Sequence, residues 1–204
     1  MNTMSAEKKS ALILAGIAVV EGFWVLLNAI HAPAKLAVFL DLTSGHPGAL
    51  LGWLCAAATF ATFFVLSLRL PSVRENLFKP TFLKFLGLAV AVAAGILEEA
   101  VFRKVLMDAL LYRGYGPLLQ VLASALAFGV AHGVWGLFGR SGRAALGATL
   151  ATGLLGAMLA VTYLAGGRSV LPCIAVHLLL NALLEPGLVL AACRGEMSRL
   201  RRAD

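Results

Sequence analysis

The chain has 204 residues, of which 60% are hydrophobic and only 13% are charged, and its mean hydropathy is +0.90. A soluble domain is about half apolar and about a quarter charged, so this composition excludes an ordinary soluble enzyme or binding module. We therefore expect an integral membrane protein. A formal charge of +7 could indicate a nucleic-acid partner in a soluble protein, but here the positions of the basic residues indicate membrane orientation. No nucleic-acid partner is expected.

Six stretches of the sequence are apolar over about 20 residues, the length that crosses a hydrocarbon core of about 30 Å as a helix. The third stretch is much longer than one crossing needs, so it is expected to tilt, kink or project from the bilayer. The predicted fold is an all-α, polytopic helix bundle that forms a single integral membrane domain over residues 1–204. In chain order the predicted spans are residues 11–30, 49–70, 82–112, 117–138, 144–164 and 170–192.

Basic residues predict the orientation of these spans. The first apolar run is too long for the central part of a signal peptide, so we expect it to be retained. Six retained spans put both termini on one side of the membrane, and twelve of the seventeen basic residues lie on that side. They are Lys8, Lys9, Arg69, Arg74, Lys79, Lys84, Arg140, Arg143, Arg194, Arg199, Arg201 and Arg202. Because positively charged loops face the cytoplasm, both termini are expected there.

Two adjacent acids stand inside the third apolar stretch, where each ionisable side chain costs several kcal/mol. Glu99 precedes Arg103 by four residues, which is the favoured arrangement for an ion pair on one helical face. The side chain of Glu98 is turned by about 100° from that of Glu99 around the helix, so it is expected to point toward a neighbouring helix. Glu98 is therefore the better candidate general base. A purely structural network of two acids and an arginine would use the same residues.

Two histidines occupy similar positions on later helices. Phe128 and His132 are four residues apart, as are His177 and Asn181, so each pair projects from one helical face. Glu98 and both histidines each fall within about five residues of the middle of a predicted span. One such histidine alone is more often hydrogen-bonded to a carbonyl or hydroxyl than catalytic. Together they lead us to expect one shared cavity in the central zone of the bilayer.

This set of side chains suits the hydrolysis of an amide bond. A carboxylate and imidazoles can activate water, and the Asn181 side-chain N–H can hydrogen-bond the oxyanion of a tetrahedral intermediate. A serine mechanism finds no support in the sequence. A second interpretation stays open, because two histidines and a glutamate also form a catalytic zinc site. The zinc ligands would then be Glu98, His132 and His177, although their spacing does not establish any cofactor.

Three motifs thus follow one another on successive predicted helices. They read Glu98-Glu99-Ala-Val-Phe-Arg103, Phe128-Gly-Val-Ala-His132 and His177-Leu-Leu-Leu-Asn181. This ordered triplet resembles the CPBP family of intramembrane proteases, which contains the CAAX prenyl endopeptidases and the bacterial Abi and bacteriocin-processing proteins. The resemblance covers about residues 82–190, and its specificity comes from the order of motifs that are weak singly.

The resemblance implies an intramembrane endopeptidase and assigns roles to the motif residues. Glu98 and His132 would activate the attacking water. His177 and Asn181 would form the oxyanion pocket. Glu99, paired with the motif arginine, would hold the geometry. Both a metal-dependent reaction and a glutamate-type reaction without metal are argued for this family, so a zinc ion stays an open alternative.

The resemblance also implies a substrate and a location. The chain is shorter than the eukaryotic CAAX proteases, and its sequence reveals no prenyl-binding groove. This favours a bacterial-type member in the inner (cell) membrane. Such an enzyme would trim a membrane-anchored protein tail or a peptide precursor, with the lipid bilayer as its environment.

Two functions without catalysis fit the same residues. A proton- or ion-coupled transporter also keeps acids and histidines in the membrane, but it usually has repeated halves, and no repeat is visible in this chain. A membrane immunity or scaffold protein would need partner surfaces instead. Two further acids receive no role: Glu21 lies in the first predicted span, and Glu185 precedes Pro186 near an expected helix end, where it would be solvated.

Overall fold

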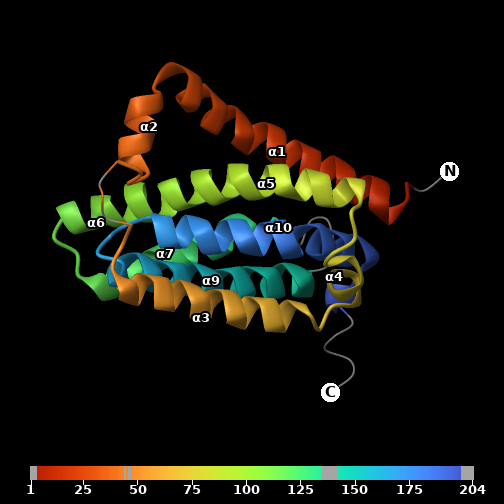
Figure 1. The fold of residues 1–204 in the computed structure, drawn as a ribbon. Helices are drawn as coiled ribbons and strands as arrows, with labels where there is room; N and C mark the ends of the chain where they lie inside the picture. The colour runs from red at the N-terminus through yellow and green to blue at the C-terminus, as the bar shows by residue number, and fades with distance from the viewer. Residues whose placement is uncertain (1–3, 44, 46, 135–141, 199–204) are drawn as a thin grey trace.

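The computed structural model describes residues 4–43, 45, 47–134 and 142–198. Within these residues the chain forms helices and turns without a β-strand, which confirms the predicted all-α fold. The long helices run side by side in one bundle (Figure 1). In chain order the elements are α1 (Ala6–His31), α2 (Pro33–Phe39), α3 (Leu50–Ser67), α4 (Pro71–Asn76), α5 (Phe82–Glu99), the π-helix η1 (Ala100–Met107), α6 (Asp108–Tyr112), α7 (Pro117–His132), α9 (Gly142–Ala165), α10 (Leu171–Arg194) and the 3₁₀-helix η2 (Glu196–Ser198).

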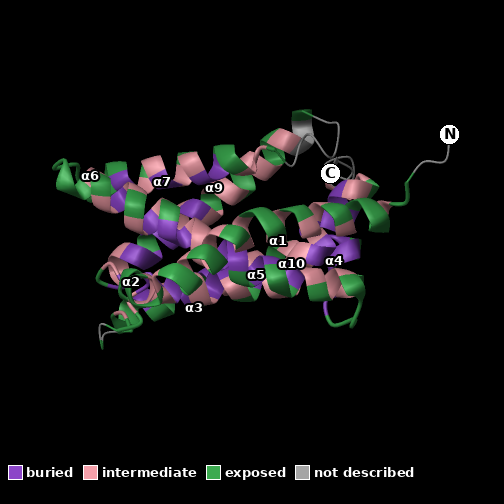
Figure 2. Cartoon of the chain, turned by 90° about the horizontal axis from the view of Figure 1, so that it is seen from above, coloured by how far each residue is buried: buried purple, intermediate pink, exposed green. Residues whose placement is uncertain are grey.

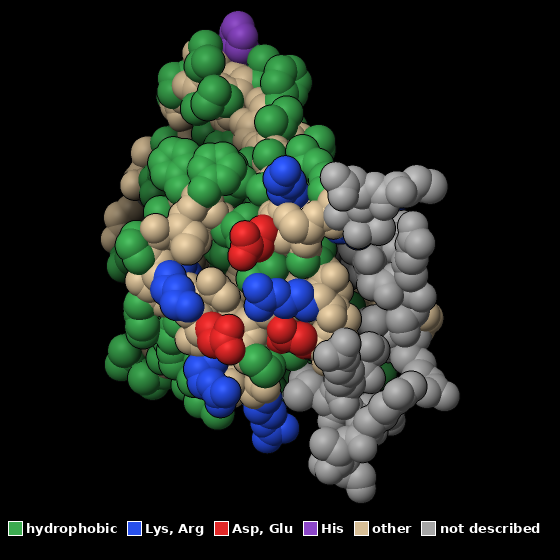
Figure 3. All heavy atoms as spheres, turned by 90° about the vertical axis from the view of Figure 1, so that its right-hand side faces the viewer, with side chains coloured by type: hydrophobic (Ala, Val, Ile, Leu, Met, Phe, Trp, Pro, Cys, Tyr) green, Lys and Arg blue, Asp and Glu red, His purple; other side chains and the backbone are tan. Residues whose placement is uncertain are grey.

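In the described part of the chain, five helical segments are long and apolar enough to cross a membrane, and α7 is a shorter apolar helix. The protein is therefore a polytopic membrane protein. The start of α1, the helix α4 and the end of α10 lie at the same end of the bundle, on the right in Figure 1. Charged side chains gather on that end, whereas apolar side chains cover much of the neighbouring surface (Figure 3). Arg140, Arg199, Arg201 and Arg202, which contribute to the orientation prediction, lie outside the described residues.

The core of the bundle forms around α10. Twelve of its residues are buried, against two in α1, and the buried positions gather where α10 meets α5 (Figure 2). A helix that is apolar on all sides suits such a central position. On α1, by contrast, Val20 and Phe23 are 73% and 69% exposed, as expected for side chains that face lipid. The candidate site residues on α5 and α10 are thus placed in the least accessible part of the fold.

The predicted third span, residues 82–112, is continuous in the structure and consists of α5, η1 and α6. The sequence pattern did not predict that its middle is π-helical, starting directly after Glu99. A π-helix has i→i+5 hydrogen bonds and is rare, often marking a functional site. Ser124 of α7 donates a hydrogen bond to the carbonyl oxygen of Phe102 in this segment, at 3.2 Å. This contact ties the irregular backbone to the neighbouring helix.

Small residues let α7 and α9 approach closely. A Cβ atom at Gly129 would lie 2.6 Å from the carbonyl oxygen of Thr149, and one at Gly156 would lie 2.9 Å from Cβ of Phe128. Glycine at these positions permits the backbone contact that drives helix association in membranes. The packing also sets the position of Phe128, which touches both histidines of the site.

The prediction that Glu185 is solvated near a helix end is wrong. Pro186 lies inside α10, which continues to Arg194. Proline lacks the N–H that would bond the carbonyl four residues earlier. Lys84 of α5 supplies donors instead, because its Nζ atom lies 3.2 Å from the carbonyl oxygen of Ala182 and 2.8 Å from that of Leu183. The helix therefore continues past the proline, and Glu185 lies within the bundle.

The fourth predicted span is too long at its C-terminal end. The helix α7 ends at His132 and is followed by Gly133, whereas the prediction ran to residue 138. Residues 135–141 lie outside the described residues. His132 is consequently the last residue of a short helix and does not lie near the middle of a span, because the chain leaves the helix at glycine.

Candidate active site

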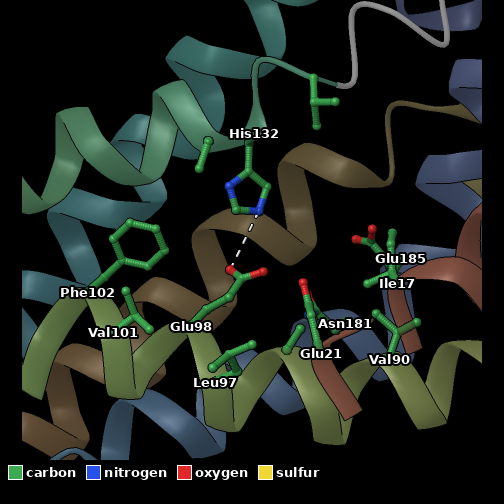
Figure 4. A pocket seen from close by; sticks show the side chains of 13 residues that line it. Ile17, Glu21, Val90, Leu97, Glu98, Val101, Phe102, His132, Asn181 and Glu185 are labelled. Carbon is green, nitrogen blue, oxygen red and sulfur yellow. Dashed lines mark ion pairs between the residues drawn. The ribbon is translucent and has the colours of Figure 1, made fainter. Parts of the chain in front are cut away.

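Three helices bring Glu98, His132 and His177 together. The Oε2 atom of Glu98 lies 3.6 Å from Nε2 of His132 and 3.8 Å from Nε2 of His177. Both distances exceed a direct hydrogen bond, but one small molecule such as water could contact both partners. The three side chains converge as predicted, and Figure 4 shows His132 directed at Glu98. They do not line one common cavity, because Glu98 and His177 line two different cavities that share His132.

The orientation of the His132 ring follows from its own helix. Its Nδ1 atom lies 2.8 Å from the carbonyl oxygen of Phe128. A carbonyl oxygen only accepts, so Nδ1 carries the proton and donates. In the neutral ring, Nε2 then offers its lone pair toward Glu98. The ring also stacks on Phe128, with centroids 4.4 Å apart and an interplanar angle of 25°. His132 is thus prepared to accept a proton or a hydrogen bond.

Glu99 holds the second histidine. Its Oε1 atom lies 2.7 Å from Nδ1 of His177, and its Oε2 atom lies 3.0 Å from Nε of Arg103. This distance confirms the predicted ion pair between Glu99 and Arg103, and both side chains are fully buried. The contact to His177 was not predicted, because it joins residues 78 positions apart on two helices. Glu99 therefore orients His177 so that Nε2 faces Glu98.

Arg103 is bound mainly by charge and by aromatic rings. Its guanidinium carbon lies 4.9 Å from the centroid of Phe128, within the range of a cation–π contact. Arg103 forms an ion pair with Glu99, but the two groups are not aligned for a hydrogen bond. The two Nη atoms of Arg103 have no hydrogen-bond acceptor among the described residues. The arginine thus neutralises Glu99 and packs against the ring of Phe128.

A mainly apolar cavity with a few polar side chains opens on one side of Glu98. It has a volume of about 440 Å³ and lies between α1, α5, α7 and α10. Apolar side chains such as Val90 and Phe102 form much of its wall, and some are drawn in Figure 4. Its polar side chains are Glu21, Glu98, His132, Asn181 and Glu185.

A second, mainly apolar cavity of about 420 Å³ lies between α3, α7, α9 and α10. It shares His132, Asn181 and Glu185 with the first cavity, and it also reaches His177. The candidate catalytic groups therefore stand where two cavities meet. A substrate chain that occupies both would cross the site.

The zinc interpretation would use Glu98, His132 and His177 as ligands. Among the described residues, no group of three or more His, Cys, Asp and Glu side chains is arranged to hold a metal ion. Glu98, His132 and His177 do not form such a group, although they are close in pairs.

The fold and its buried polar groups define a helical, polytopic membrane protein. A family model described as Type II CAAX prenyl endopeptidase Rce1-like matches residues 80–183. The match covers half of the chain, and the chain belongs to this family. Searches of curated proteins and of solved structures returned no match. The family is one of membrane-embedded CAAX-type proteases, which confirms the resemblance seen in the motifs. All seven defining residues of the three motifs fall within the matched segment, and Glu21 and Glu185 lie outside it.

Proposed function

We propose that the protein is an intramembrane endopeptidase that uses Glu98 to activate water against a peptide bond of a membrane-associated substrate. The observation that carries this proposal is the placement of one Glu98 carboxylate oxygen within 4 Å of two imidazole nitrogens, at 3.6 and 3.8 Å. Family membership supports the protease class. The roles of the individual residues are our proposal.

The first step is the attack of water on the substrate carbonyl. A water molecule between Glu98 and His132 gives a proton to the Glu98 carboxylate while its oxygen bonds to the carbonyl carbon. The free Nε2 lone pair of His132 accepts the second water hydrogen and fixes the direction of attack. This step produces a tetrahedral intermediate with a negative oxygen.

The second step is the collapse of this intermediate. The Asn181 amide and the protonated Nε2 of His177 donate hydrogen bonds to the oxyanion, and Glu99 compensates the charge of the imidazolium. The C–N bond then breaks, and the leaving amine takes the proton from Glu98. Glu98 returns to its starting form, so the reaction needs no covalent intermediate.

We propose that the reaction proceeds without a metal ion, since the described donors do not form a metal-binding group. A chelator is expected to leave the rate of peptide cleavage unchanged. Inductively coupled plasma mass spectrometry of the chelator-treated protein should show that trace zinc has been removed. A loss of activity that only added zinc restores would contradict the metal-free reaction.

The substrate is proposed to be a membrane-anchored protein tail or peptide precursor. Glu98 lies in a long apolar helix, so water and substrate must reach it through the cavities and not across exposed backbone. The proposed location is a bacterial cell membrane with both termini in the cytoplasm, based on the basic residues at the end of the bundle that carries α4.

The test compares one peptide sequence with and without a lipid anchor. Purified protein in liposomes is incubated with a pool of lipid-anchored peptides, and mass spectrometry identifies the products. The best-cleaved sequence is then measured in anchored and soluble forms, with Glu98→Gln as the inactive control. Cleavage of the anchored form alone supports the proposal. Equal cleavage of both forms contradicts the membrane-associated substrate, and cleavage of neither by the wild type favours a transporter or an immunity protein.

A further inference from the structure

Two carboxylates outside the family match share the cavity with Glu98. Glu21 comes from α1 and Glu185 from α10, and both line the first cavity together with Glu98 (Figure 4). The three carboxylates therefore face one common space. Glu98 acts in the proposed catalytic steps, whereas Glu21 and Glu185 take no part in them.

The described part of the cavity wall contains no matching positive charge. Among the described residues that line it are three carboxylates and one imidazole but neither lysine nor arginine. The Oε2 atom of Glu21 is buried and meets no hydrogen-bond donor among the described residues. Lys84, on the same helix as Glu98, donates to two carbonyl oxygens of α10 instead. Carboxylates kept at membrane depth without a partner are costly, which marks them as functional.

We propose that Glu21 and Glu185 determine specificity by binding the side chain of a lysine or arginine close to the scissile bond. This inference rests on the proposed peptidase function and adds a preference within it. A cation from the substrate lets both carboxylates ionise in the apolar cavity, and the charge-assisted hydrogen bonds fix the peptide beside Glu98. Binding energy from this remote contact orients the peptide bond for attack.

The shape of the site favours a long side chain over a bare metal ion. The described acids and histidines do not group closely enough to hold a metal, whereas a lysine or arginine side chain can extend between separated carboxylates. The second cavity favours other residues, because Glu185 is the one carboxylate among its described lining residues, and that lining also includes Arg69. A basic residue of the substrate is therefore directed to the first cavity, and apolar residues to the second.

The test uses the anchored peptide identified above, made with lysine, norleucine or glutamate at each position near the scissile bond. Norleucine has the length of lysine without its charge. For the wild type, we expect kcat/KM at one position to be about ten-fold or more higher for lysine than for norleucine, the effect of one charged hydrogen bond. In Glu21→Gln and Glu185→Gln this preference should fall to about two-fold or less, because cleavage of the lysine peptide is lowered more than cleavage of the norleucine peptide.

A reversed charge gives the sharpest form of the test. Glu21→Lys should prefer glutamate over lysine at the same position. Glu75→Gln, which changes an exposed acid on α4, is the matched control and should keep the wild-type preference. The rate on norleucine peptides and the thermal unfolding midpoint report whether each variant is folded.

Each outcome is informative about one hypothesis. If the wild type shows Glu98-dependent cleavage without a preference for a basic residue at any position, the specificity proposal is overturned and the peptidase proposal stands. An equal loss of kcat/KM for all three peptides in folded Glu21→Gln would also overturn the specificity proposal. That pattern would indicate that Glu21 transfers protons or supports the structure of the site. If the wild type cleaves no peptide, the proposed function itself fails.

Discussion

Ionisable side chains gather in two regions of this bundle, the cavity around Glu98 and a network at the end that carries α2 and α6, on the left in Figure 1. In the network, Asp108 accepts hydrogen bonds from Tyr163 at 2.9 Å and from two nitrogens of Arg168 at 2.9 and 2.5 Å. Arg168 also donates to the side chain of Gln120 at 3.0 Å. These contacts join α6, α7, α9 and the turn before α10.

Asp41 plays a similar part in the same region. Its carboxylate accepts from Nζ of Lys104 at 2.8 Å and from the backbone N–H of Val170 at 2.9 Å. Asp41 and Arg168 both have positive φ angles, 61° and 66°, in turns between helices. The network therefore consists of short, direct bonds that hold turns in place.

The cavity contains the opposite arrangement. Among the described residues, Oε2 of Glu98 and Oε2 of Glu21 have no partner within hydrogen-bond distance. The contacts of Glu98 to the two histidines are 3.6 and 3.8 Å long. Fully paired groups stabilise a fold, whereas groups with unused donors or acceptors can act on another molecule. The charged residues of the network are thus bonded directly to one another, whereas those of the cavity keep lone pairs that the proposed chemistry would use. We therefore expect substitutions in the two regions to separate activity from stability.

The largest effect is expected for Glu98→Gln. Glutamine cannot take a proton from water, so the cleavage rate should fall by about 10²–10⁴-fold. The thermal unfolding midpoint in detergent should not fall, since the Oε2 atom of Glu98 has no direct partner to lose. A variant that unfolds at a clearly lower temperature would show that Glu98 belongs to the structural class.

Glu99→Gln should lower both stability and activity. The substitution leaves Arg103 as an uncompensated buried charge, which costs about 3–5 kcal/mol, and it weakens the contact that orients His177. Chemical denaturation and the cleavage rate at a temperature where the variant is folded measure the two effects. Complete inactivity with wild-type stability would show that Glu99, and not Glu98 alone, takes part in proton transfer.

Asp41→Ala is expected to reduce stability by about 2–3 kcal/mol without a specific effect on catalysis. It removes two hydrogen bonds and places alanine at a positive φ angle, which costs about 1–2 kcal/mol. Asp41→Asn is the matched control, because asparagine tolerates this conformation and keeps an acceptor. Denaturation curves should rank wild type, Asn and Ala in that order, and a reversed order of the two variants would contradict the role of the turn.

Tyr163→Phe should have the smallest effect. It removes one hydroxyl hydrogen bond to Asp108, which is partly exposed, so the loss of stability is expected to be about 1 kcal/mol. Cleavage at saturating substrate should match the wild type. A strong loss of activity in folded Tyr163→Phe would break the distinction between the two regions.

Part of the site could be predicted from local spacing. The Glu99–Arg103 pair and the Phe128–His132 stack each lie within one helix, so their four-residue separation was sufficient. The His177–Glu99 contact could not be predicted, because it depends on the rotation of α10 against α5. The place of Glu185 was misjudged because the lysine that compensates Pro186 comes from another helix.

The helical membrane fold, the position of the third span and the family motifs could all be predicted from the amino-acid sequence. These properties follow from local hydropathy and from helical periodicity, which need no knowledge of neighbouring helices. The position of Glu98 between two imidazoles, the π-helix after Glu99 and the presence of Glu21 in the same cavity became visible in the folded bundle. They depend on helix packing, which fixes the rotation and depth of each helix, and small residues such as Gly129 and Gly156 set how closely the helices approach.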